Sequence, residues 1–378
     1  MLQITIVGWY GTETLGDRAI LAGLFSLFHE TGEEFSIRLG SLYPFFSEQT
    51  VLEDEAFYRQ CSGQSDLNLS LFDSTRRKEL DAAIRKSDLV VIGGGPLMGI
   101  GGLFMLEYAF AKARKLRKKT MILGCGVGPI HNRIYEKSLC NIVSLSDLTI
   151  FRDEVSRISY CRLSRKPYPV EEAIDPAVFA VQEFQKKWSG TNSSEQIVVC
   201  LRDFLVVEKT AASQNINIAL SELVRNLTET INKPLRLLPM HYFSVGGDDR
   251  YFLNRIVQEI GSSEITVENE PQTLVQTFQT FAEAFACVGM RFHSVVLQTI
   301  LNGNNIILDY VDPKRGKIVG FLQQIGGEEF YRAHMCHLKT AVRLTLPSFP
   351  PEPFHYNTAL TDSYRKQYVR RISETILN

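Results

Sequence analysis

The sequence lacks the features that mark several extreme classes of protein. Its formal net charge at pH 7 is −1, from 41 Lys and Arg against 42 Asp and Glu, so no global positive field attracts nucleic acid. No apolar run approaches the roughly 18 residues that a membrane-spanning helix needs. The first residues carry no basic segment of the kind that begins a signal peptide. We therefore expect a cytoplasmic protein that binds no nucleic acid.

Cysteine-based sites and nucleotide-binding glycine motifs are also missing. The seven cysteines are scattered and form no Cys-x-x-Cys pair, which argues against a zinc site and against a disulfide framework. We expect reduced thiols and no bound metal. The glycine-rich loops that are present match neither the dinucleotide fingerprint Gly-x-Gly-x-x-Gly nor a P-loop that ends in Gly-Lys-Ser/Thr.

What the sequence does contain is a repeated alternation of strand and helix patterns. Short apolar runs lie at residues 4–7, 89–92, 121–124, 148–151, 197–201, 235–240, 287–288 and 306–308. Helical patterns separate most of them, and this order is typical of an α/β protein with parallel sheets. Residues 45–75 are polar and give no clear assignment.

The length of 378 residues favours two domains over one core. We expect a Rossmann-like lobe at residues 1–180 and a second at 195–350, with a polar connection between them. A helical pattern at 351–378 is expected to form a C-terminal helix that packs back on the first lobe.

The segment Gly289-Met290-Arg291-Phe292-His293 is the most informative motif. It joins an apolar run to a helical pattern, so backbone N–H groups converge where an arginine and a histidine also stand. Arg291 matches carboxylate or phosphate, and His293 exchanges protons near neutral pH. The segment therefore indicates a pocket for a small anion. The alternative is structural: Arg291 pairs with a carboxylate and His293 caps the helix.

Two further arginines directly follow expected strands. Arg152 comes after the run at 148–151, and Arg202 after the run at 197–201. Ligands of parallel sheets bind at the carboxyl ends of the strands, so we expect both arginines to face a cleft. In the alternative interpretation each arginine pairs with the aspartate that follows it, Asp153 or Asp203.

Two glycine loops are candidate ligand loops. The first contains Gly11, Gly16 and then Asp17, which stands where a helix N-cap is expected. The second is Gly93-Gly94-Gly95, which suggests a ligand lying against bare backbone. A tight turn is the simpler explanation for either loop.

Two remaining candidates are single residues at expected strand ends. His241 follows the run at 235–240. Lys314, or Lys317, follows the run at 306–308 and would add positive charge to the anion pocket. A hydrogen-bonded structural histidine and a solvated surface lysine are the more common outcomes.

Taken in order, these motifs resemble the polysaccharide pyruvyl transferase family. The resemblance rests on Gly8-x-x-Gly11-x-x-x-x-Gly16-Asp17, Gly93-Gly94-Gly95, Arg152-Asp153-Glu154-x-Ser156, Asp175-Pro176-Ala177, Gly289-Met290-Arg291-x-His293, and Asp312-Pro313-Lys314 followed by Gly320-Phe321-Leu322. It spans roughly residues 1–330. One departure is Thr14, where the family usually has Asn.

The resemblance implies a fold similar to GT-B glycosyltransferases, with two Rossmann-like lobes that face a cleft. It implies phosphoenolpyruvate as the co-substrate in place of a cofactor. The acceptor would be a sugar of a bacterial surface polysaccharide or of its lipid-linked precursor, with the first lobe on the acceptor side and the second on the donor side. In the family, the residues matching Arg152, Arg291 and His293 are implicated in donor binding and chemistry.

The chemistry of a pyruvate ketal suggests roles for these residues. We expect His293 to protonate the methylene carbon, and Arg152, Arg202, Arg291 and Lys314 to hold the carboxylate and phosphate. Asp17 or another acidic residue would take the acceptor proton. Two alternatives stay open: a nucleotide-sugar glycosyltransferase that uses Glu328 or Glu329, and a glycan-binding or scaffold protein without catalysis.

A basic run from Lys112 to Lys119 contains six cations in eight residues. It suggests peripheral contact with anionic lipid at the inner face of the membrane. The simpler interpretation is a solvated helix end, where cations favour the C-terminus of the helix.

Overall fold

The computed structural model describes residues 1–12, 14–188, 190, 194–206, 209–243, 245–311, 316–339 and 349–377. The chain divides into two compact units. Unit 1 contains Met1–Glu13, Asp17–Glu183 and Thr358–Asn378, and unit 2 contains Thr14–Gly16 and Phe184–Asn357. The tripeptide Thr14–Gly16 belongs with unit 2 because the Leu15 N–H donates to the carbonyl of Met240 at 3.2 Å. Thr14 also forms an isolated antiparallel bridge with His241.

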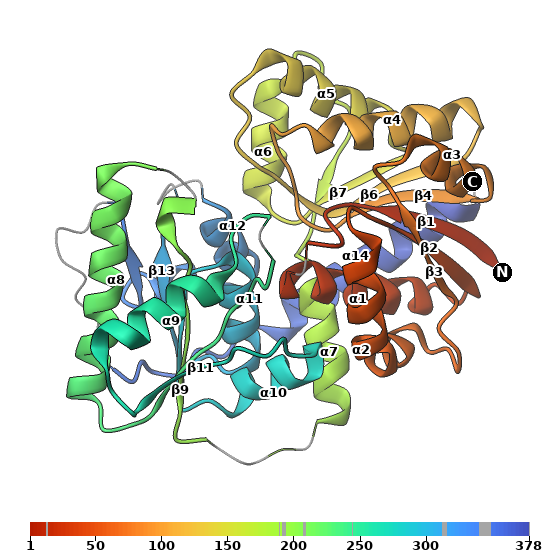
Figure 1. Ribbon diagram of the computed structural model, residues 1–378. Helices are drawn as coiled ribbons and strands as arrows, with labels where there is room; N and C mark the ends of the chain where they lie inside the picture. Colours follow the sequence, from red (N-terminus) through yellow and green to blue (C-terminus); the bar gives the residue numbers. More distant parts are fainter. Residues whose placement is uncertain are drawn as a thin grey trace. The chain divides into compact units, whose positions relative to one another are not determined.

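Unit 1 is a parallel sheet covered by helices on both faces (Figure 1). Its strands are β1 (Leu2–Val7), β2 (Phe35–Ser41), β3 (Leu69–Asp73), β4 (Leu89–Gly93), β5 (Pro96–Leu97), β6 (Lys119–Val127), β7 (Leu148–Phe151) and β8 (Glu171–Glu172). Their spatial order is β3-β2-β1-β4-β6-β7-β8, with β5 paired to β6. The five residues of β4 are all buried, as expected for a central strand with helices on both sides.

Helices join most of the consecutive strands of unit 1, as parallel pairing requires. They are α1 (Leu15–Glu30), α2 (Pro44–Ser62), α3 (Arg77–Arg85), α4 (Gly102–Lys115), α5 (Arg133–Ser144), α6 (Glu154–Leu163), α7 (Ala177–Lys187) and α14 (Thr358–Leu377). Figure 1 shows α3, α4 and α5 over one face of the sheet and α1, α2 and α14 over the other. The polar region without an assignment, 45–75, thus contains one long helix and one strand.

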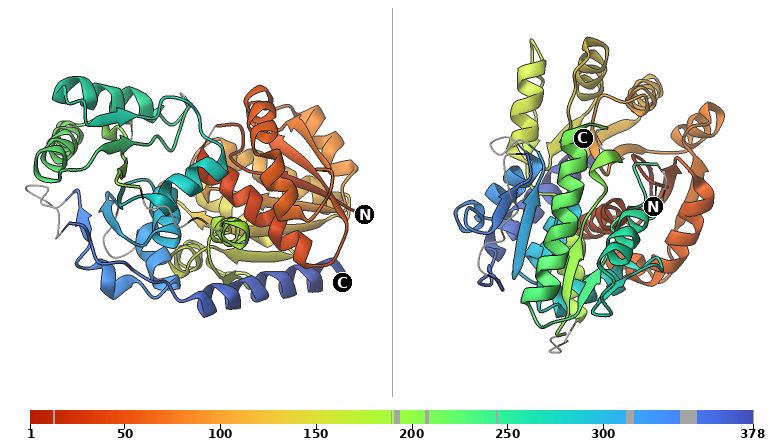
Figure 2. Two further views of the ribbon diagram at one scale, coloured as in Figure 1. Left: turned by 90° about the horizontal axis from the view of Figure 1, so that it is seen from below. Right: turned by 60° about the vertical axis from the view of Figure 1, so that its left-hand side comes forward.

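The C-terminal helix α14 packs on unit 1, and Figure 2 shows it in blue beside the red and yellow elements of that unit. Tyr368 is fully buried and donates a hydrogen bond to the carbonyl of Ile174 at 2.9 Å. Its ring meets Phe179 edge to face at 5.6 Å. Arg365 donates to Ser26 at 2.8 Å and to Glu183 at 3.0 Å. These contacts explain why a helix so distant in sequence belongs to the first unit.

Unit 2 is a second parallel sheet of the same kind. Its strands are β9 (Ile197–Cys200), β10 (Leu235–Leu237), β11 (Ile265–Val267), β12 (Ala286–Gly289), β13 (Asn305–Asp309) and β14 (Met335–His337), in the order β11-β10-β9-β12-β13-β14. Its α-helices are α8 (Ala211–Thr230), α9 (Asp249–Ile260), α10 (Leu274–Glu283), α11 (Phe292–Leu301), α12 (Lys317–Gln324) and α13 (Glu328–Tyr331). The helices α8 and α9 cover one face of the sheet, and α11 and α12 cover the other (Figure 1).

Both sheets have the strand order of a Rossmann fold. Numbered within each unit, and leaving out the two-residue strand β5, the first six strands run 3-2-1-4-5-6. The chain reverses direction across the sheet between strands 1 and 4, which are β1 and β4 in unit 1 and β9 and β12 in unit 2. Ligands of such sheets bind at this reversal point, outside the carboxyl ends of the strands.

Candidate functional site

The carboxyl edge of the unit 2 sheet gathers several of the predicted residues. Arg202 follows β9, and Arg291 follows β12, so both stand at the reversal point of the sheet. His293 is the second residue of α11, which begins directly after Arg291. Gly289 ends β12, and the room that a side chain would take there is filled by the buried amide of Gln298. The sheet thus brings two guanidinium groups and an imidazole to one edge.

Arg291 is held by Asp249, the first residue of α9. Nε and Nη2 of Arg291 donate to the two carboxylate oxygens of Asp249 at 2.7 and 2.6 Å. Asp249 is 1% exposed and also accepts a hydrogen bond from the Met240 N–H at 3.1 Å. Within the described part of the chain, no acceptor lies on Nη1 of Arg291. The pair therefore fixes the guanidinium by one edge and leaves another donor for a ligand.

Arg202 and Lys317 meet at the hydroxyl of Tyr310. Nη1 of Arg202 and Nζ of Lys317 each lie 3.4 Å from this oxygen. Nη2 of Arg202 lies 3.4 Å from the carbonyl of Gly246. Arg202 thus contacts a phenol rather than the neighbouring Asp203, so the alternative pairing of Arg202 with Asp203 is wrong. We call Arg202, Arg291 and Lys317 the cation cluster.

The charges of the cation cluster act on one another. Burial lowers the pKa of Arg202, and the nearby positive charge of Arg291 lowers it further. Burial also opposes the charge on Arg291, but Asp249 and other neighbours outweigh it and raise the pKa of Arg291. Cations packed this closely repel one another, and an incoming anion relieves that repulsion. The edge is therefore suited to an anionic ligand.

His293 packs against the backbone of Gly16. A Cβ atom added to Gly16 would lie 1.9 Å from Nδ1 of His293. The His293 ring also meets the Phe292 ring edge to face at 5.0 Å. His293 is half-buried and lies inside the first turn of α11, so it is not the helix N-cap that the structural alternative expects. The ring therefore depends on a glycine from the start of the chain for its position.

We predict that Gly16→Ala lowers turnover through His293. The new methyl group must displace the imidazole, and a displacement of about 1 Å at a reacting group costs about 10²-fold in rate. Alanine in a helix is intrinsically favourable, by about 1 kcal/mol relative to glycine, so thermal stability should not explain the loss. Gly101→Ala is the control, because a Cβ there meets no atom within 4 Å. Equal turnover in both variants would contradict the role of this contact.

His241 is buried beside the same edge of unit 2. Its exposed fraction is 3%, and its carbonyl accepts a hydrogen bond from the Asp249 N–H at 3.0 Å. A Cβ at Gly246 would lie 3.0 Å from its ring. The main chain of His241 thus helps to position Asp249, which holds Arg291. This contact gives His241 a structural role.

Arg152 lies in unit 1, within a cluster of buried charges. Its side chain is 4% exposed and forms ion pairs of 3.4 Å with Asp153 and Asp175. Asp153 in turn caps α6 by accepting from the Ser156 N–H at 2.6 Å. Two motifs of the resemblance, separated by 23 residues, therefore meet in one ion-pair cluster. The pairing of Arg152 with Asp153, which was the structural alternative to a ligand-binding role, is present, with Asp175 as a second partner.

The glycine loops of unit 1 are filled by the protein itself. A Cβ at Gly95 would lie 2.1 Å from the ring of Trp9, and one at Gly94 would lie 3.0 Å from the Tyr10 hydroxyl. Gly93 packs against Leu24 in the same way. These aromatic contacts and the positive φ angles of Gly94 (91°) and Gly95 (67°) explain the three glycines without a ligand.

The first glycine loop is equally well packed. A Cβ at Gly11, which has φ = 89°, would lie 2.2 Å from Oγ of Ser41. The expectation that Asp17 is the N-cap of the first helix is wrong. Helix α1 begins two residues earlier, at Leu15, so Asp17 lies within its first turn. The negative carboxylate there still interacts favourably with the positive end of the helix dipole.

Lys314 lies outside the described residues. Lys317, the other lysine expected near the anion pocket, is the one that the structure places in the cation cluster. Tyr310 was not among the predicted residues. The rule that selected Arg202, a functional side chain directly after a parallel strand, applies equally to Tyr310, which follows β13. Tyr310 was overlooked because an aromatic residue after an apolar run suggests core packing.

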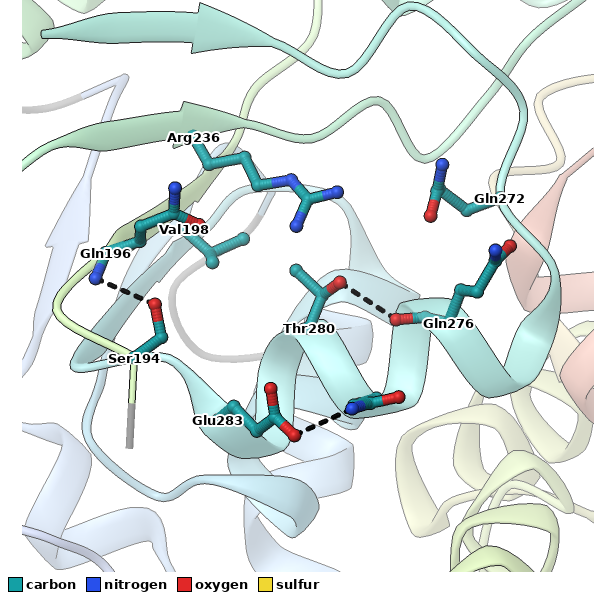
Figure 3. Close-up of a pocket in the computed structure, with 9 residues that line it drawn as sticks. Ser194, Gln196, Val198, Arg236, Gln272, Gln276, Thr280 and Glu283 are labelled. Carbon is teal, nitrogen blue, oxygen red and sulfur yellow. Dashed lines mark hydrogen bonds between the residues drawn. The ribbon is translucent and has the colours of Figure 1, made fainter. Parts of the chain in front are cut away.

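A separate cavity of about 260 Å³ lies in unit 2 and contains none of the predicted residues (Figure 3). Its lining includes Ser194 and Gln196, which precede β9, and Arg236, whose side chain extends over the cavity in Figure 3. Val198 of β9, Gln272 and residues of α10 also line it. Ser194 and Gln196 stand at the amino end of β9, whereas the cation cluster stands at the carboxyl ends of the strands. The cavity is therefore distinct from the candidate site.

Three other properties bear on function. Among the residues that the structure describes, no group of three or more His, Cys, Asp or Glu side chains is placed to hold a metal ion. No helix in the described ranges is both long and apolar enough to cross a membrane. The seven cysteines are all free thiols.

Comparison with solved structures defines the fold class. UDP-GlcNAc 2-epimerase from Neisseria meningitidis matches with a TM-score of 0.55 at 12% identity, over 100% of both chains. UDP-N-acetylglucosamine 2-epimerase from Rickettsia bellii matches with a TM-score of 0.59 at 10% identity, over 100% of this chain and 96% of that one. At such identities the likeness shows the fold alone. The protein is thus an α/β protein of the GT-B type, with two Rossmann-like lobes.

Comparison with protein families is more specific. The model of the family described as polysaccharide pyruvyl transferase matches residues 15–313. This match covers most of the chain, including Arg202 and Arg291 of the cation cluster, and ends four residues before Lys317. The chain belongs to the polysaccharide pyruvyl transferase family. No curated protein matches the sequence.

Proposed function

We propose that this protein transfers pyruvate from phosphoenolpyruvate to two hydroxyls of a sugar and so forms a cyclic ketal. The observation that carries the proposal is the cation cluster of Arg202, Arg291 and Lys317 next to His293 at the carboxyl edge of unit 2. Phosphoenolpyruvate has a carboxylate and a phosphate on three carbons, and several fixed cations suit its charge. Unit 2 is accordingly the donor-binding unit.

The reaction has three proton transfers and forms two C–O bonds. His293 delivers a proton to the methylene carbon of phosphoenolpyruvate, and positive charge develops on the carbon that carries the phosphate. A sugar hydroxyl bonds to that carbon and loses its proton to a base. The C–O bond to phosphate breaks, the second hydroxyl closes the ring, and its proton leaves with the phosphate. General acid catalysis of the first step contributes about 10²–10⁴-fold in rate.

The cation cluster serves the same steps by electrostatics. Arg291 offers the donor that Asp249 leaves unused, and Arg202 and Lys317 add positive charge at Tyr310. Such preorganised charge stabilises the departing phosphate without reorganisation during the reaction. A role of Arg152 in donor binding, implied by the family resemblance, remains a prediction, because this guanidinium already pairs with two buried aspartates.

Unit 1 is our candidate for acceptor binding, and Asp17 remains a candidate base there. The acceptor is a sugar of a bacterial surface polysaccharide or its lipid-linked precursor, and we expect the protein to act in the cytoplasm. Two exposed glutamates, Glu328 and Glu329 on α13, keep a nucleotide-sugar reaction as the alternative.

The experiment that tests this function follows phosphate release from phosphoenolpyruvate. The protein is mixed with a panel of lipid-linked and free glycans, and the products are analysed by mass spectrometry. We expect release that depends on one glycan and a pyruvyl mass added to that glycan. Glycosyl transfer from a nucleotide sugar, with phosphoenolpyruvate untouched, would replace the proposal with its alternative.

We also propose that the basic run from Lys112 to Lys119 contacts anionic lipid. Two of its cations are already paired, Lys112 with Asp81 at 2.7 Å and Arg114 with Asp147 at 2.5 Å. Lys115 and Arg117 are exposed at the end of α4. These two side chains are therefore the ones that can reach a lipid headgroup.

Charge reversal at these two positions is predicted to weaken binding to anionic vesicles by at least about tenfold, since each cation near such a surface contributes about 1 kcal/mol. The variant is Lys115→Glu with Arg117→Glu. A matched control is Arg85→Glu with Lys86→Glu, an exposed pair at the end of α3. Vesicle flotation measures the difference, and equal binding by both variants would end the membrane proposal.

A further inference from the structure

Tyr310 is the group on which the cation cluster converges. It directly follows β13 and is 7% exposed. Its hydroxyl lies 3.4 Å from both Nη1 of Arg202 and Nζ of Lys317. The guanidinium carbon of Arg202 is 5.8 Å from its ring centre. A neutral phenol contributes little to balancing these charges, whereas a phenolate balances one of them.

Several of the elements around Tyr310 carry charged groups that act on it. Lys317 on α12, Arg202 after β9 and Arg291 before α11 are positive. The negative Asp249 of α9 is taken up by Arg291, and Asp309 lies 3.4 Å from Nδ1 of His337. Two cationic donors therefore lie at the Tyr310 hydroxyl, and the charge of Arg291 acts on it as well.

Ionisation of Tyr310 follows from this balance. Burial disfavours the phenolate, but the charges of Lys317, Arg202 and Arg291 outweigh burial and lower the pKa of Tyr310 to about 7. An anion bound to the same cations places like charge beside the phenolate. Like charge disfavours ionisation, so the bound anion favours the protonated phenol.

We propose that Tyr310 is the internal counterion of the anion site: its phenolate neutralises the cation cluster in the free protein and takes up one proton when an oxyanion occupies the site. The bond that forms is the O–H bond of the phenol, and the proton comes from solvent. The identification of phosphoenolpyruvate as the natural oxyanion rests on the proposed function. The coupling itself rests on the contacts of Tyr310 and applies to any divalent oxyanion.

Proton uptake by Tyr310 predicts how anion binding depends on pH. Linkage is reciprocal, so if anion binding adds a proton, raising the pH must weaken anion binding. Between about pH 6 and about pH 8 the dissociation constant should rise about tenfold for a group that titrates near neutrality. Tyr310→Phe removes the competing phenolate. It should therefore bind the anion more tightly than the wild type at about pH 8, whereas loss of a merely structural hydroxyl would weaken binding.

The test uses sulfate, a divalent oxyanion that does not titrate in this range, and the full-length wild type and Tyr310→Phe. Calorimetry measures sulfate binding across the pH range, and near-ultraviolet absorbance measures tyrosinate. We expect a tyrosinate signal near neutral pH in the wild type alone, which sulfate suppresses and chloride at equal ionic strength does not. Imidazoles that titrate in the same range are present in both proteins, so the difference between the proteins reports Tyr310.

Lys317→Met provides a second variant that retains the phenol. Removing this cation should move the tyrosinate transition to higher pH. A wild-type signal that is insensitive to sulfate, or equal pH dependence in wild type and Tyr310→Phe, would overturn the proposal. If these results hold while phosphoenolpyruvate does not react, the proposed function fails and the inference about Tyr310 stands.

Discussion

His293→Ala is expected to lose about 10²–10⁴-fold in turnover while its fold and its affinity for phosphoenolpyruvate are retained. The imidazole is the proton-exchanging group that follows Arg291 on α11, and its loss removes the acid that we assign to the methylene carbon. The ring is half-buried against Gly16, so its removal leaves a small gap. Single-turnover kinetics with phosphoenolpyruvate measure the loss.

Two companion variants make the result specific to proton transfer. His293→Gln keeps a polar group of similar length that does not act as an acid at neutral pH, and it should be as slow as the alanine variant. His355→Ala removes an exposed histidine of unit 2 and should turn over normally. Turnover by His293→Ala at the wild-type rate would remove His293 from the mechanism.

Arg291→Met is expected to reduce both stability and donor affinity. The substitution leaves Asp249, which is 1% exposed, as an uncompensated buried carboxylate. Breaking a buried pair in this way costs about 3–5 kcal/mol, and the 16% exposure of the Arg291 side chain places the expected cost near the lower end. Thermal unfolding measures the loss of stability, and calorimetric titration measures the affinity.

A double variant separates the two effects. Arg291→Met with Asp249→Asn removes both charges, so the unpaired carboxylate is gone and most of the stability should return. The donor that contacts the ligand is still missing, and binding of phosphoenolpyruvate should remain at least about tenfold weaker, the effect of about 1.4 kcal/mol. Normal affinity in the double variant would show that Arg291 has a structural role alone.

Local patterns in the sequence predicted the parts of the fold and site that depend on local order. The alternation of apolar runs and helical patterns indicated parallel sheets, and two such sheets are present. The position directly after a strand selected Arg202, because the carboxyl ends of parallel strands share one edge. The junction of an apolar run, a glycine and a helical pattern selected Arg291. Helix α2 was missed, since its sequence is polar and only one face of it is buried.

Contacts between distant residues could not be predicted in this way. Gly16 and His293 are far apart in sequence, and nothing in the local pattern around Gly16 indicates that it belongs with unit 2. The pairing of Arg291 with Asp249 likewise joins α9 to the end of β12, and many acidic residues were equally plausible partners. The lowered pKa of Tyr310 depends on cations from three segments of the chain, and a single-residue pattern cannot show it.

The central claim is that the carboxyl edge of unit 2 binds phosphoenolpyruvate through the cation cluster. Calorimetric titration of phosphoenolpyruvate into wild-type protein tests it most directly, with Arg202→Met and Arg236→Met run in parallel. We predict one saturable site in the wild type, at least about tenfold weaker binding in Arg202→Met, and unchanged binding in Arg236→Met, whose arginine lines the separate cavity. Absence of phosphoenolpyruvate binding in the wild type, or equal binding in all three proteins, would contradict the claim.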